Sequence, residues 1–410
     1  MQVGFARNSD APDKQMTETY DVVVIGGGIH GAGIAQAASA RGFSVMVLEQ
    51  TGIASGTSSR SSKLIHGGLR YLESRQFSLV RECLRERTLL LELAPQLIEL
   101  KPFYIPVYQD TTRRPWLLRA GLSLYAVLGG LHPATRFRRV PQDQWKRLDG
   151  LDTAHLEAVF QYNDAQTDDA ALTRAVMRSA QRMGAQLKMP ATFTGAHLDD
   201  RYNTIEYRHN GTIETCRAAV LVNAAGPWVR QVLSRITPAP PQLKIELVQG
   251  THIMVPGTLT QGIYYVEAQD ERVVFVMPWQ GNILVGTTES IYQGDPADVR
   301  PLPQEIAYLM ETLSHYFPRY RSGLPILGAT AGLRVLPSSG DGTESSAVSV
   351  NARLRETVLQ SDRRNRPRLL TVYGGKLTTY RLTAERVMAH LADVLPVREM
   401  VADTRHLKLT

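Results

Sequence analysis

Residues 20–49 read YDVVVIGGGIHGAGIAQAASARGFSVMVLE, with a run of glycines between two apolar stretches. Tyr20–Ile25 is rich in β-branched residues, which predicts a strand buried on both faces. Ile34–Arg41 is rich in alanine and predicts a helix, and Phe43–Leu48 predicts a second buried strand that ends at Glu49. The order strand, glycine turn, helix, strand is that of a Rossmann-like α/β fold.

The glycines follow the pattern GxGxxG at Gly26, Gly28 and Gly31. Gly26 permits a tight turn, Gly28 lets the backbone approach a pyrophosphate, and Gly31 allows close packing of the helix on the strand. Glu49 lies 21 residues after Gly28, where a carboxylate accepts hydrogen bonds from ribose hydroxyls. The segment therefore predicts a dinucleotide site. The acid disfavours a 2′-phosphate, so FAD and NAD remain and NADP is unfavoured.

Composition bounds the class of protein without choosing the function. The 410 residues are 43% hydrophobic and 21% charged, which excludes a wholly disordered, collagen-like or polytopic membrane protein. The formal charge is +7, so anionic partners are favoured. We see no nucleic-acid-binding motif. Cys83 and Cys216 form neither a disulfide framework nor a metal motif. We therefore expect no bound metal and a protein that resides in a reducing compartment.

A second informative segment is residues 56–71, GTSSRSSKLIHGGLRY. Its hydroxyls and paired glycines suit a backbone that lies along a long polar ligand. Further short motifs follow in order. They are VNAAGPWV (222–229), GTHIMVP (250–256), FVMPW (275–279), VGTTE (285–289), GLRVL (332–336) and YGGKLTTYR (373–381).

Together these motifs resemble the FAD-dependent glycerol-3-phosphate dehydrogenases, in the D-amino-acid-oxidase-like flavoprotein superfamily. The resemblance runs from about Tyr20 to about His390. It departs at His30, where the family usually has Asn, and at Ala37, where it usually has Asp. The sequence also ends soon after GGKLTTYR, whereas many members continue into a helical region.

The fold class we expect is α/β, a Rossmann-like FAD-binding domain with an inserted substrate domain built on an antiparallel sheet. We expect a polar extension over 1–17 and a discontinuous FAD-binding domain over 18–100, 150–244 and 325–400. A substrate or cap domain takes 101–149 and 245–324. Apolar periodicity predicts helices over 78–94, 168–184 and 377–392, and short strands between Gly, Asp and Asn turns over 245–290.

The resemblance implies that FAD is the cofactor and that its binding residues come from the motifs above. They are Gly26, Gly28, Gly31, Glu49, Thr57, Ser58, Ser59, His66, Gly67, Gly226, Gly375, Lys376, Leu377 and Thr378. It also implies oxidation of sn-glycerol 3-phosphate to dihydroxyacetone phosphate, by hydride transfer from C2 to flavin N5. Electrons then pass to a quinone, in a role belonging to glycerol metabolism.

That reaction requires an anion site and a base. We expect Arg70 and Arg334 to hold the phosphate, because the guanidinium fork matches its oxygens, and Tyr71 to add a hydroxyl. His252 and His66 are the candidate bases, since histidine titrates near neutrality. Lys376 is expected to add charge near the flavin N1–C2 edge or to reach the phosphate. All three of His252, His66 and Lys376 are candidate catalytic residues.

Residues 113–139 combine Trp, Tyr and Leu with six arginines. The apolar part, Trp116–Leu128, is too short to span a bilayer, but it suits a helix lying on anionic lipid. No secretory signal is recognised. We therefore expect a cytoplasmic protein, peripheral on the inner face of the cell membrane; an ordinary core helix is the alternative, and a homodimer is one option.

Three other readings stay open on sequence alone. The same fold and the same two arginines would serve a glycerol-3-phosphate oxidase that uses O₂. They would also serve an oxidase of amino acids or 2-hydroxy acids, because arginines bind carboxylates too. A catalytically inactive flavoprotein is the non-enzymatic alternative.

Overall fold

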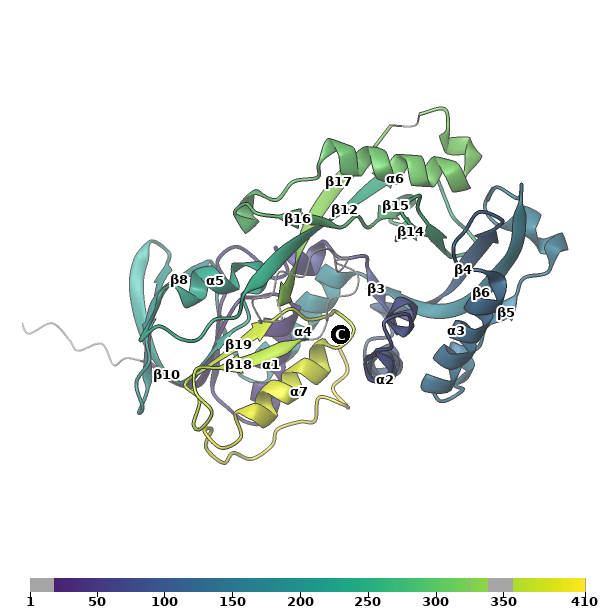
Figure 1. Cartoon of the computed structure of the whole chain (residues 1–410). Coiled ribbons are helices and arrows are strands. Elements are labelled where there is room, and N and C mark those ends of the chain that lie inside the picture. Colours follow the sequence, from purple (N-terminus) through teal and green to yellow (C-terminus); the bar gives the residue numbers. More distant parts are fainter. Residues whose placement is uncertain (1–17, 324, 338–356, 410) are drawn as a thin grey trace, which may run out of the picture.

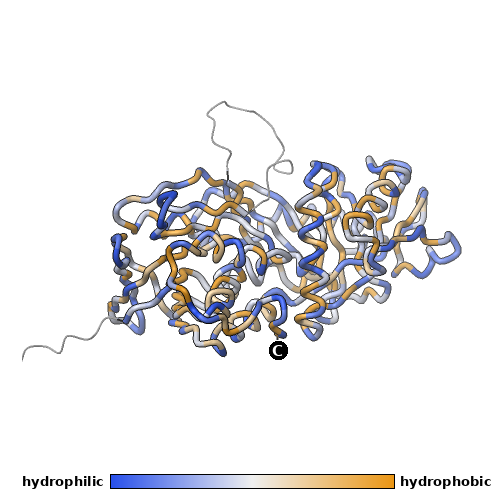
Figure 2. Tube along the Cα trace, turned by 90° about the horizontal axis from the view of Figure 1, so that it is seen from below, coloured by the Kyte–Doolittle hydropathy of each residue, from blue (hydrophilic) through white to orange (hydrophobic). Residues whose placement is uncertain are grey.

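The computed structural model describes residues 18–323, 325–337 and 357–409 and contains two large sheets (Figures 1 and 2). The predicted extension over 1–17 lies outside the described residues. The first sheet, with α1 and α7, occupies the lower left of Figure 1, and the second sheet extends toward the upper right. Figure 2 shows hydrophobic positions along the chain in both halves of the elongated molecule. The predicted mixed α/β fold with parallel and antiparallel sheets is confirmed.

The first sheet is built around β1 (Thr19–Ile25), which pairs in parallel with β2 on one side and β10 on the other. Val22 and Val24 on β1 are fully buried, because helices α1, α4 and α7 cover that face of the sheet. The remaining strands are β2 (Val45–Leu48), β7 (Gln186–Lys188), β8 (Ala191–His197), β9 (Asn203–His209), β10 (Thr212–Asn223), β11 (Ile236–Thr237), β18 (Val358–Ser361) and β19 (Leu369–Tyr373).

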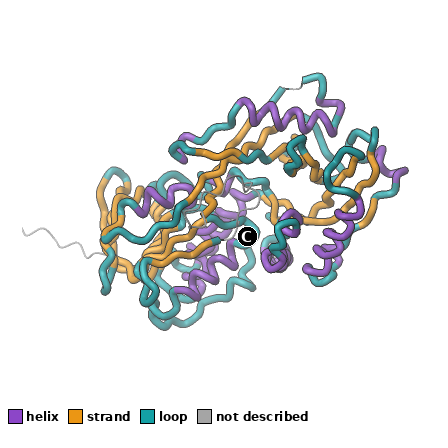
Figure 3. Tube along the Cα trace, viewed as in Figure 1, coloured by secondary structure: helices purple, strands orange, loops and turns teal. Residues whose placement is uncertain are grey.

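The second sheet is mainly antiparallel, and its strands are the orange segments on the right-hand side of Figure 3. Its longest pairing joins β4 to β6, and β12 pairs with both β15 and β17. Its strands are β3 (Leu64–Ile65), β4 (Ile98–Tyr108), β5 (Arg138–Arg139), β6 (Leu156–Thr167), β12 (Ile245–Val255), β13 (Ile263–Glu267), β14 (Val273–Trp279), β15 (Asn282–Gly286), β16 (Ser290–Tyr292) and β17 (Gly328–Pro337).

Seven α-helices are found in the described part of the chain. Helix α6 lies above the second sheet in Figure 1, and α2 and α3 lie below it. Their bounds are α1 (Ile29–Ala40), α2 (Phe77–Leu93), α3 (Pro115–Leu128), α4 (Asp169–Arg182), α5 (Val229–Leu233), α6 (Pro303–Tyr316) and α7 (Tyr380–His390).

Strand pairing differs from the predicted division of the chain at three places. Strand β3 lies within 18–100, assigned to the FAD-binding domain, yet it pairs with β6 in the second sheet. Strand β6 falls within 150–244 and β17 within 325–400, both assigned to the FAD-binding domain, yet both pair within the second sheet. The physical reason is long-range: β6 pairs with β4 and β17 with β12, and those partners are invisible in a local pattern. The second sheet therefore draws on more of the chain than 101–149 and 245–324.

Helix boundaries also differ at two glycine-containing turns. The first helix begins at Ile29, inside the glycine motif, rather than at Ile34. The last begins at Tyr380 rather than at Leu377, since residues 374–379 form a turn first. The helices predicted over 78–94 and 168–184 are present as α2 and α4.

Candidate active site

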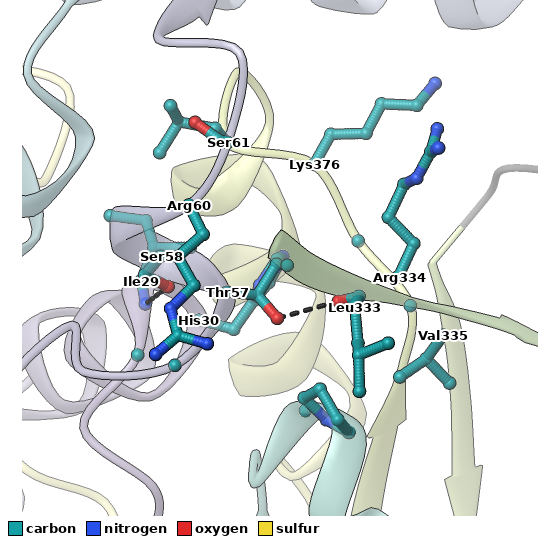
Figure 4. A pocket seen from close by; sticks show the side chains of 18 of the residues that line it. Ile29, His30, Thr57, Ser58, Arg60, Ser61, Leu333, Arg334, Val335 and Lys376 are labelled. Carbon is teal, nitrogen blue, oxygen red and sulfur yellow. Dashed lines mark hydrogen bonds between the residues drawn. The ribbon is translucent and has the colours of Figure 1, made fainter. Parts of the chain in front are cut away.

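One cavity of about 730 Å³ extends from the β1–α1 turn to the face of the second sheet. It is lined by residues of β1, the 56–71 segment, β12, β17 and the 374–378 turn. In Figure 4, Ser58 and His30 lie at one end and Arg334 and Lys376 extend to another side. The dinucleotide motif and the candidate anion-binding residues therefore meet in one space.

The glycine turn has the geometry that a bound pyrophosphate requires. Gly26 has φ of +109°, and a Cβ on it would lie 2.7 Å from the carbonyl oxygen of Ala224. Gly31 is closer still, because a Cβ would lie 1.9 Å from the carbonyl oxygen of Gly26. The turn therefore tolerates no side chain at either position, and helix α1 packs tightly behind it.

Polar groups near this turn are held in fixed positions. Glu49 Oε2 accepts the N–H of Gly27 at 2.7 Å, and Oε1 accepts the N–H of Thr51 at 2.8 Å. Ser58 Oγ accepts the N–H of Ile29 at 2.9 Å. Glu49 and Ser58 both line the cavity, so a carboxylate and a hydroxyl are presented beside the glycines. These groups and the glycine cradle fit the adenosine and pyrophosphate of FAD.

The two predicted phosphate-binding arginines meet through a carboxylate that the sequence analysis did not single out. Arg334 Nη1 lies 2.9 Å from Glu289 Oε1, and Arg70 Nη2 lies 3.4 Å from the same oxygen. Arg272 donates to the main-chain oxygen of Glu289 at 2.7 Å. Arg70 comes from the 3₁₀ turn Leu69–Leu72 and Arg334 from β17, so Glu289 links two distant segments.

Lys376 adds a third cation to the same region. Its Nζ lies 3.8 Å from the centre of the Tyr71 ring, and Tyr71 directly follows Arg70. The ammonium is buried and has no hydrogen-bond partner among the described residues. A buried cation in that condition is costly unless an anion binds there. Tyr71 thus contacts Lys376 through its ring.

The two candidate bases differ in environment. His252 on β12 is only 3% exposed, and its Nε2 lies 3.1 Å from Ser62 Oγ. Burial, together with the nearby charges of Lys63 and Arg334, lowers the pKa of His252 to about 3. His66 also lines the cavity, and its ring lies edge-on to Phe275 at 6.4 Å. Both rings reach the cavity, and His252 is neutral at physiological pH.

Most of the predicted site residues line this cavity, and three do not. Gly31, Ser59 and Gly67 lie outside its lining. The packing explains this, because Gly31 faces Gly26 and the N–H of Gly67 faces Tyr125. Lining residues that sequence reasoning missed include His30, Ser62, Arg272, Phe275, Glu289 and Trp228.

Some of the missed residues lie in motifs that the sequence analysis had already quoted. Glu289 closes the quoted segment VGTTE, Ser62 lies in the serine-rich stretch, and His30 was noted as a departure. His30 packs against Gly375, where a Cβ would lie 2.2 Å from its ring. Ala37 is buried in the apolar cluster of α1, α4 and α7, so its place is filled by packing.

A dinucleotide cradle that opens onto a cationic pocket defines an oxidoreductase with a nucleotide cofactor. The sequence model of the family described as FAD dependent oxidoreductase matches residues 21–381. The chain belongs to this family of FAD-dependent oxidoreductases, and FAD is its cofactor.

Individual relatives support this assignment. The chain is 38% identical over 386 residues to a glycerol-3-phosphate dehydrogenase of Pseudomonas aeruginosa, covering 93% of this chain and 73% of the relative. It is 38% identical over 403 residues to a D-erythritol 1-phosphate dehydrogenase of Brucella abortus, covering 95% and 76%. The crystal structure of a glycerol-3-phosphate dehydrogenase from Bacillus halodurans with FAD superposes with a TM-score of 0.69. That match has 26% identity and covers 95% of this chain and 68% of the other.

Proposed function

We propose that the enzyme oxidises sn-glycerol 3-phosphate to dihydroxyacetone phosphate and passes the electrons to a quinone. The observation that carries the proposal is the cluster of Arg70, Arg334 and Lys376 around one end of the FAD cavity. The names of the relatives in Pseudomonas aeruginosa and Bacillus halodurans support the same substrate.

The charge of the cluster favours a phosphate over a carboxylate. Arg70, Arg334 and Lys376 stand against the single carboxylate of Glu289, which leaves a net charge of two positive units. The neighbouring Arg272 is balanced by Asp270, 3.1 Å away. A phosphate monoester carries about 1.5 to 2 negative charges at pH 7, whereas an amino acid or 2-hydroxy acid offers one carboxylate. The dianion therefore neutralises this pocket, and the monoanion does not. This supports a phosphate ester over the amino-acid and 2-hydroxy-acid alternatives.

The residues of this chain then have three tasks. When bound, FAD supplies the acceptor for the hydride that leaves C2 of the substrate. Arg70 and Arg334 orient the substrate through its phosphate, so that C2 is fixed relative to the cofactor. A base takes the proton of the C2 hydroxyl as the carbonyl forms.

We assign the base to His66 rather than His252. A base whose pKa is near 3 takes up a proton poorly at neutral pH, because basicity falls with pKa. His252 instead accepts from, or donates to, Ser62 and holds that hydroxyl against the second sheet. His66 lies on the same segment as Arg70, four residues earlier, so base and anion site are positioned together.

A longer polyol phosphate is a second candidate substrate. The relative in Brucella abortus is named for D-erythritol 1-phosphate and is as similar in sequence as the first relative. Both substrates present a phosphate to the arginines and a secondary alcohol further along the chain. The cationic cluster does not separate them, so chain length is the property to test.

Helix α3 supports association with an anionic membrane surface at the cytoplasmic face. Trp116 is 71% exposed and Val127 59% exposed, and Leu117 and Leu124 are exposed with them. Arg114 precedes these apolar residues in the sequence, and Arg119 lies between Leu117 and Leu124. Such a helix fits an interface of acyl chains and lipid headgroups, where a quinone is reached. None of the described helices is long and apolar enough to cross a bilayer.

The test is bleaching of the flavin absorbance under anaerobic conditions by a panel of phosphate esters, alcohols, hydroxy acids and amino acids. We expect glycerol 3-phosphate to bleach it and glycerol, D-glycerate and glycine to leave it unchanged, and the rate with D-erythritol 1-phosphate measures the preference for chain length. Reduction by glycine or glycerate but not by glycerol 3-phosphate would overturn the proposal, and no reduction by any member would favour an inactive flavoprotein. Oxygen uptake without added quinone then separates an oxidase from a dehydrogenase.

A further inference from the structure

The segment that carries His66 and Arg70 is held at one peptide group by Tyr125, which lies outside the cavity, and by Thr378, which lines it. The N–H of Gly67 donates to Tyr125 Oη at 2.9 Å. On the other edge of the same peptide, Thr378 Oγ1 donates to the carbonyl oxygen of His66 at 3.3 Å, and it lies 3.1 Å from the N–H of His66. The His66–Gly67 peptide is therefore fixed from both sides.

Tyr125 is itself held by a buried ion pair. Its hydroxyl donates to Asp164 Oδ2 at 2.6 Å, and Arg87 Nη1 lies 2.5 Å from Asp164 Oδ1. Tyr125 and Arg87 are 0% exposed and Asp164 is 1% exposed. Burial first, and then the charge of Asp164, raise the pKa of Tyr125 far above its usual value. The hydroxyl stays protonated, so it donates to Asp164 and accepts from Gly67 at once.

The buried group of Tyr125, Asp164 and Arg87 is expected to contribute no more to the free energy of unfolding than apolar side chains of the same volume would. Arg87 Nε and Nη2 have no hydrogen-bond partner in the described part of the chain. A buried ion pair often contributes no more to stability than apolar residues of the same volume, and unpaired donors add a cost. A role in fixing the His66–Gly67 peptide explains why a hydroxyl and a carboxylate stand here.

The space around Gly67 is adapted to this contact. A Cβ at Gly67 would lie 2.4 Å from Tyr125 Oη and 2.6 Å from Leu84 Cδ2. The next residue, Gly68, has φ of +75° and turns the chain toward Arg70. Since Gly67 approaches Tyr125 so closely, a shift of the hydroxyl would be transmitted directly to the backbone of His66.

We propose that Tyr125 is a positioning residue, which sets the orientation of the His66 side chain through the Gly67 amide. The inference rests on the proposed function, in which His66 takes the substrate proton. Helix α3 then has two roles. Its buried Tyr125 positions the active-site segment, and its exposed face carries Trp116. Tyr125 itself does not line the cavity.

The test replaces Tyr125 by Phe in the FAD-loaded enzyme and measures anaerobic flavin reduction by glycerol 3-phosphate. We expect the limiting rate to fall by about 10- to 100-fold, because small displacements of a reacting group have effects of that size. The substrate concentration for half-saturation should change less than the rate does, since Arg334 and Lys376 lie outside the segment that Tyr125 holds. Tyr316→Phe is the matched control, because Tyr316 is equally buried and donates to the main-chain oxygen of Glu267.

A double substitution separates positioning from a general structural role. If Tyr125 acts through His66, Tyr125→Phe should lower the rate of a His66→Asn enzyme by less than about twofold. Equal, multiplicative losses in both backgrounds would overturn the proposal, as would a Tyr125→Phe rate equal to that of the wild type. If the wild type itself is not reduced by glycerol 3-phosphate, the proposed function fails, and the hydrogen-exchange measurement below still tests this inference.

Hydrogen exchange gives a readout that needs no activity. In Tyr125→Phe, residues 64–72 should exchange faster than in the wild type, while strands β13–β15 stay unchanged. Unchanged exchange over 64–72 would contradict the proposal whether or not the variant is active. If Tyr125→Phe does not retain FAD, the same measurements are made on Asp164→Glu. That substitution keeps the negative charge but moves the carboxylate that accepts from the Tyr125 hydroxyl.

Discussion

At the scale of single residues, the placement of charged side chains determines how the site can bind an anion. Glu289 occupies donors of both Arg334 and Arg70, and Lys376 is buried beside Tyr71. The turn that bears Glu289 is held rigidly, because Thr288 and Ser290 on either side donate to Glu305 Oε1 at 2.8 and 2.9 Å. The arginines are therefore aligned before any substrate arrives, which lowers the entropy cost of binding it.

The buried histidine predicts how stability depends on pH. The pKa of His252 is about 3 in the folded protein and about 6.5 in an unfolded chain. The unfolded state therefore binds a proton as the pH falls below 6.5 while the folded state does not. The free energy of unfolding should decrease on acidification, by about 2 kcal/mol from His252 alone between pH 6.5 and 4.5.

Urea unfolding at several pH values checks this prediction. The decrease should be shallower in His252→Asn, and His406→Asn, at an exposed position, should behave as the wild type. A His252→Asn protein that loses stability as steeply as the wild type would contradict the buried, neutral histidine.

Some single residues were within reach of sequence reasoning and others were not. Arg70, Arg334 and Lys376 follow glycines within recognisable motifs, and they are found in one cavity. Glu289 was missed although its motif was in hand, because nothing in a one-dimensional pattern shows that its carboxylate meets Arg70, 219 residues away. Tyr125 was predicted only as part of an amphipathic helix, whereas its hydroxyl is an internal hydrogen-bond partner.

At the scale of elements, the glycine-rich turns separate what local pattern predicts from what it does not. Apolar periodicity located α2 and α4 to within about two residues, as is usual for helix ends. It misplaced the start of α7, because Leu377–Thr379 form a turn against the cavity rather than a first helical turn. Ligand-facing turns are where local propensity is overridden.

Helix α3 carries the prediction about membranes. Replacing Trp116 by Asp places a charge in the exposed apolar surface, so binding to vesicles of anionic phospholipid should weaken by about 10-fold or more. Cosedimentation with vesicles measures this. Val397→Asp is the control, because Val397 is fully exposed but lies outside α3.

Two results would contradict the assignment of α3. One is a wild-type protein that does not bind anionic vesicles at all. The other is an equal loss of binding in Trp116→Asp and Val397→Asp, which would reflect net charge alone.

At the scale of the whole molecule, the site exists only because two sheets meet. The first supplies the glycine turn and Glu49, and the second supplies His252 and Arg334. Sequence order predicted both sheets, but not that β6 and β17 pair within the second, since their partners β4 and β12 lie far away in the chain. The family resemblance predicted the superfamily from sequence alone. The boundary between the two sheets, where the cavity lies, is known only from the strand pairing in the structure.

The most direct measurement is an anaerobic titration of the FAD-loaded enzyme with glycerol 3-phosphate, comparing wild type with Arg334→Ala. We expect the wild-type flavin to be fully reduced. With Arg334→Ala, half-saturation of the rate of flavin reduction should require on the order of 10- to 100-fold more substrate, which corresponds to the loss of a charge-assisted hydrogen bond of about 1.5–3 kcal/mol. A wild-type flavin that stays oxidised, or an Arg334→Ala titration that matches the wild type, would contradict a phosphate held by this arginine beside the cofactor.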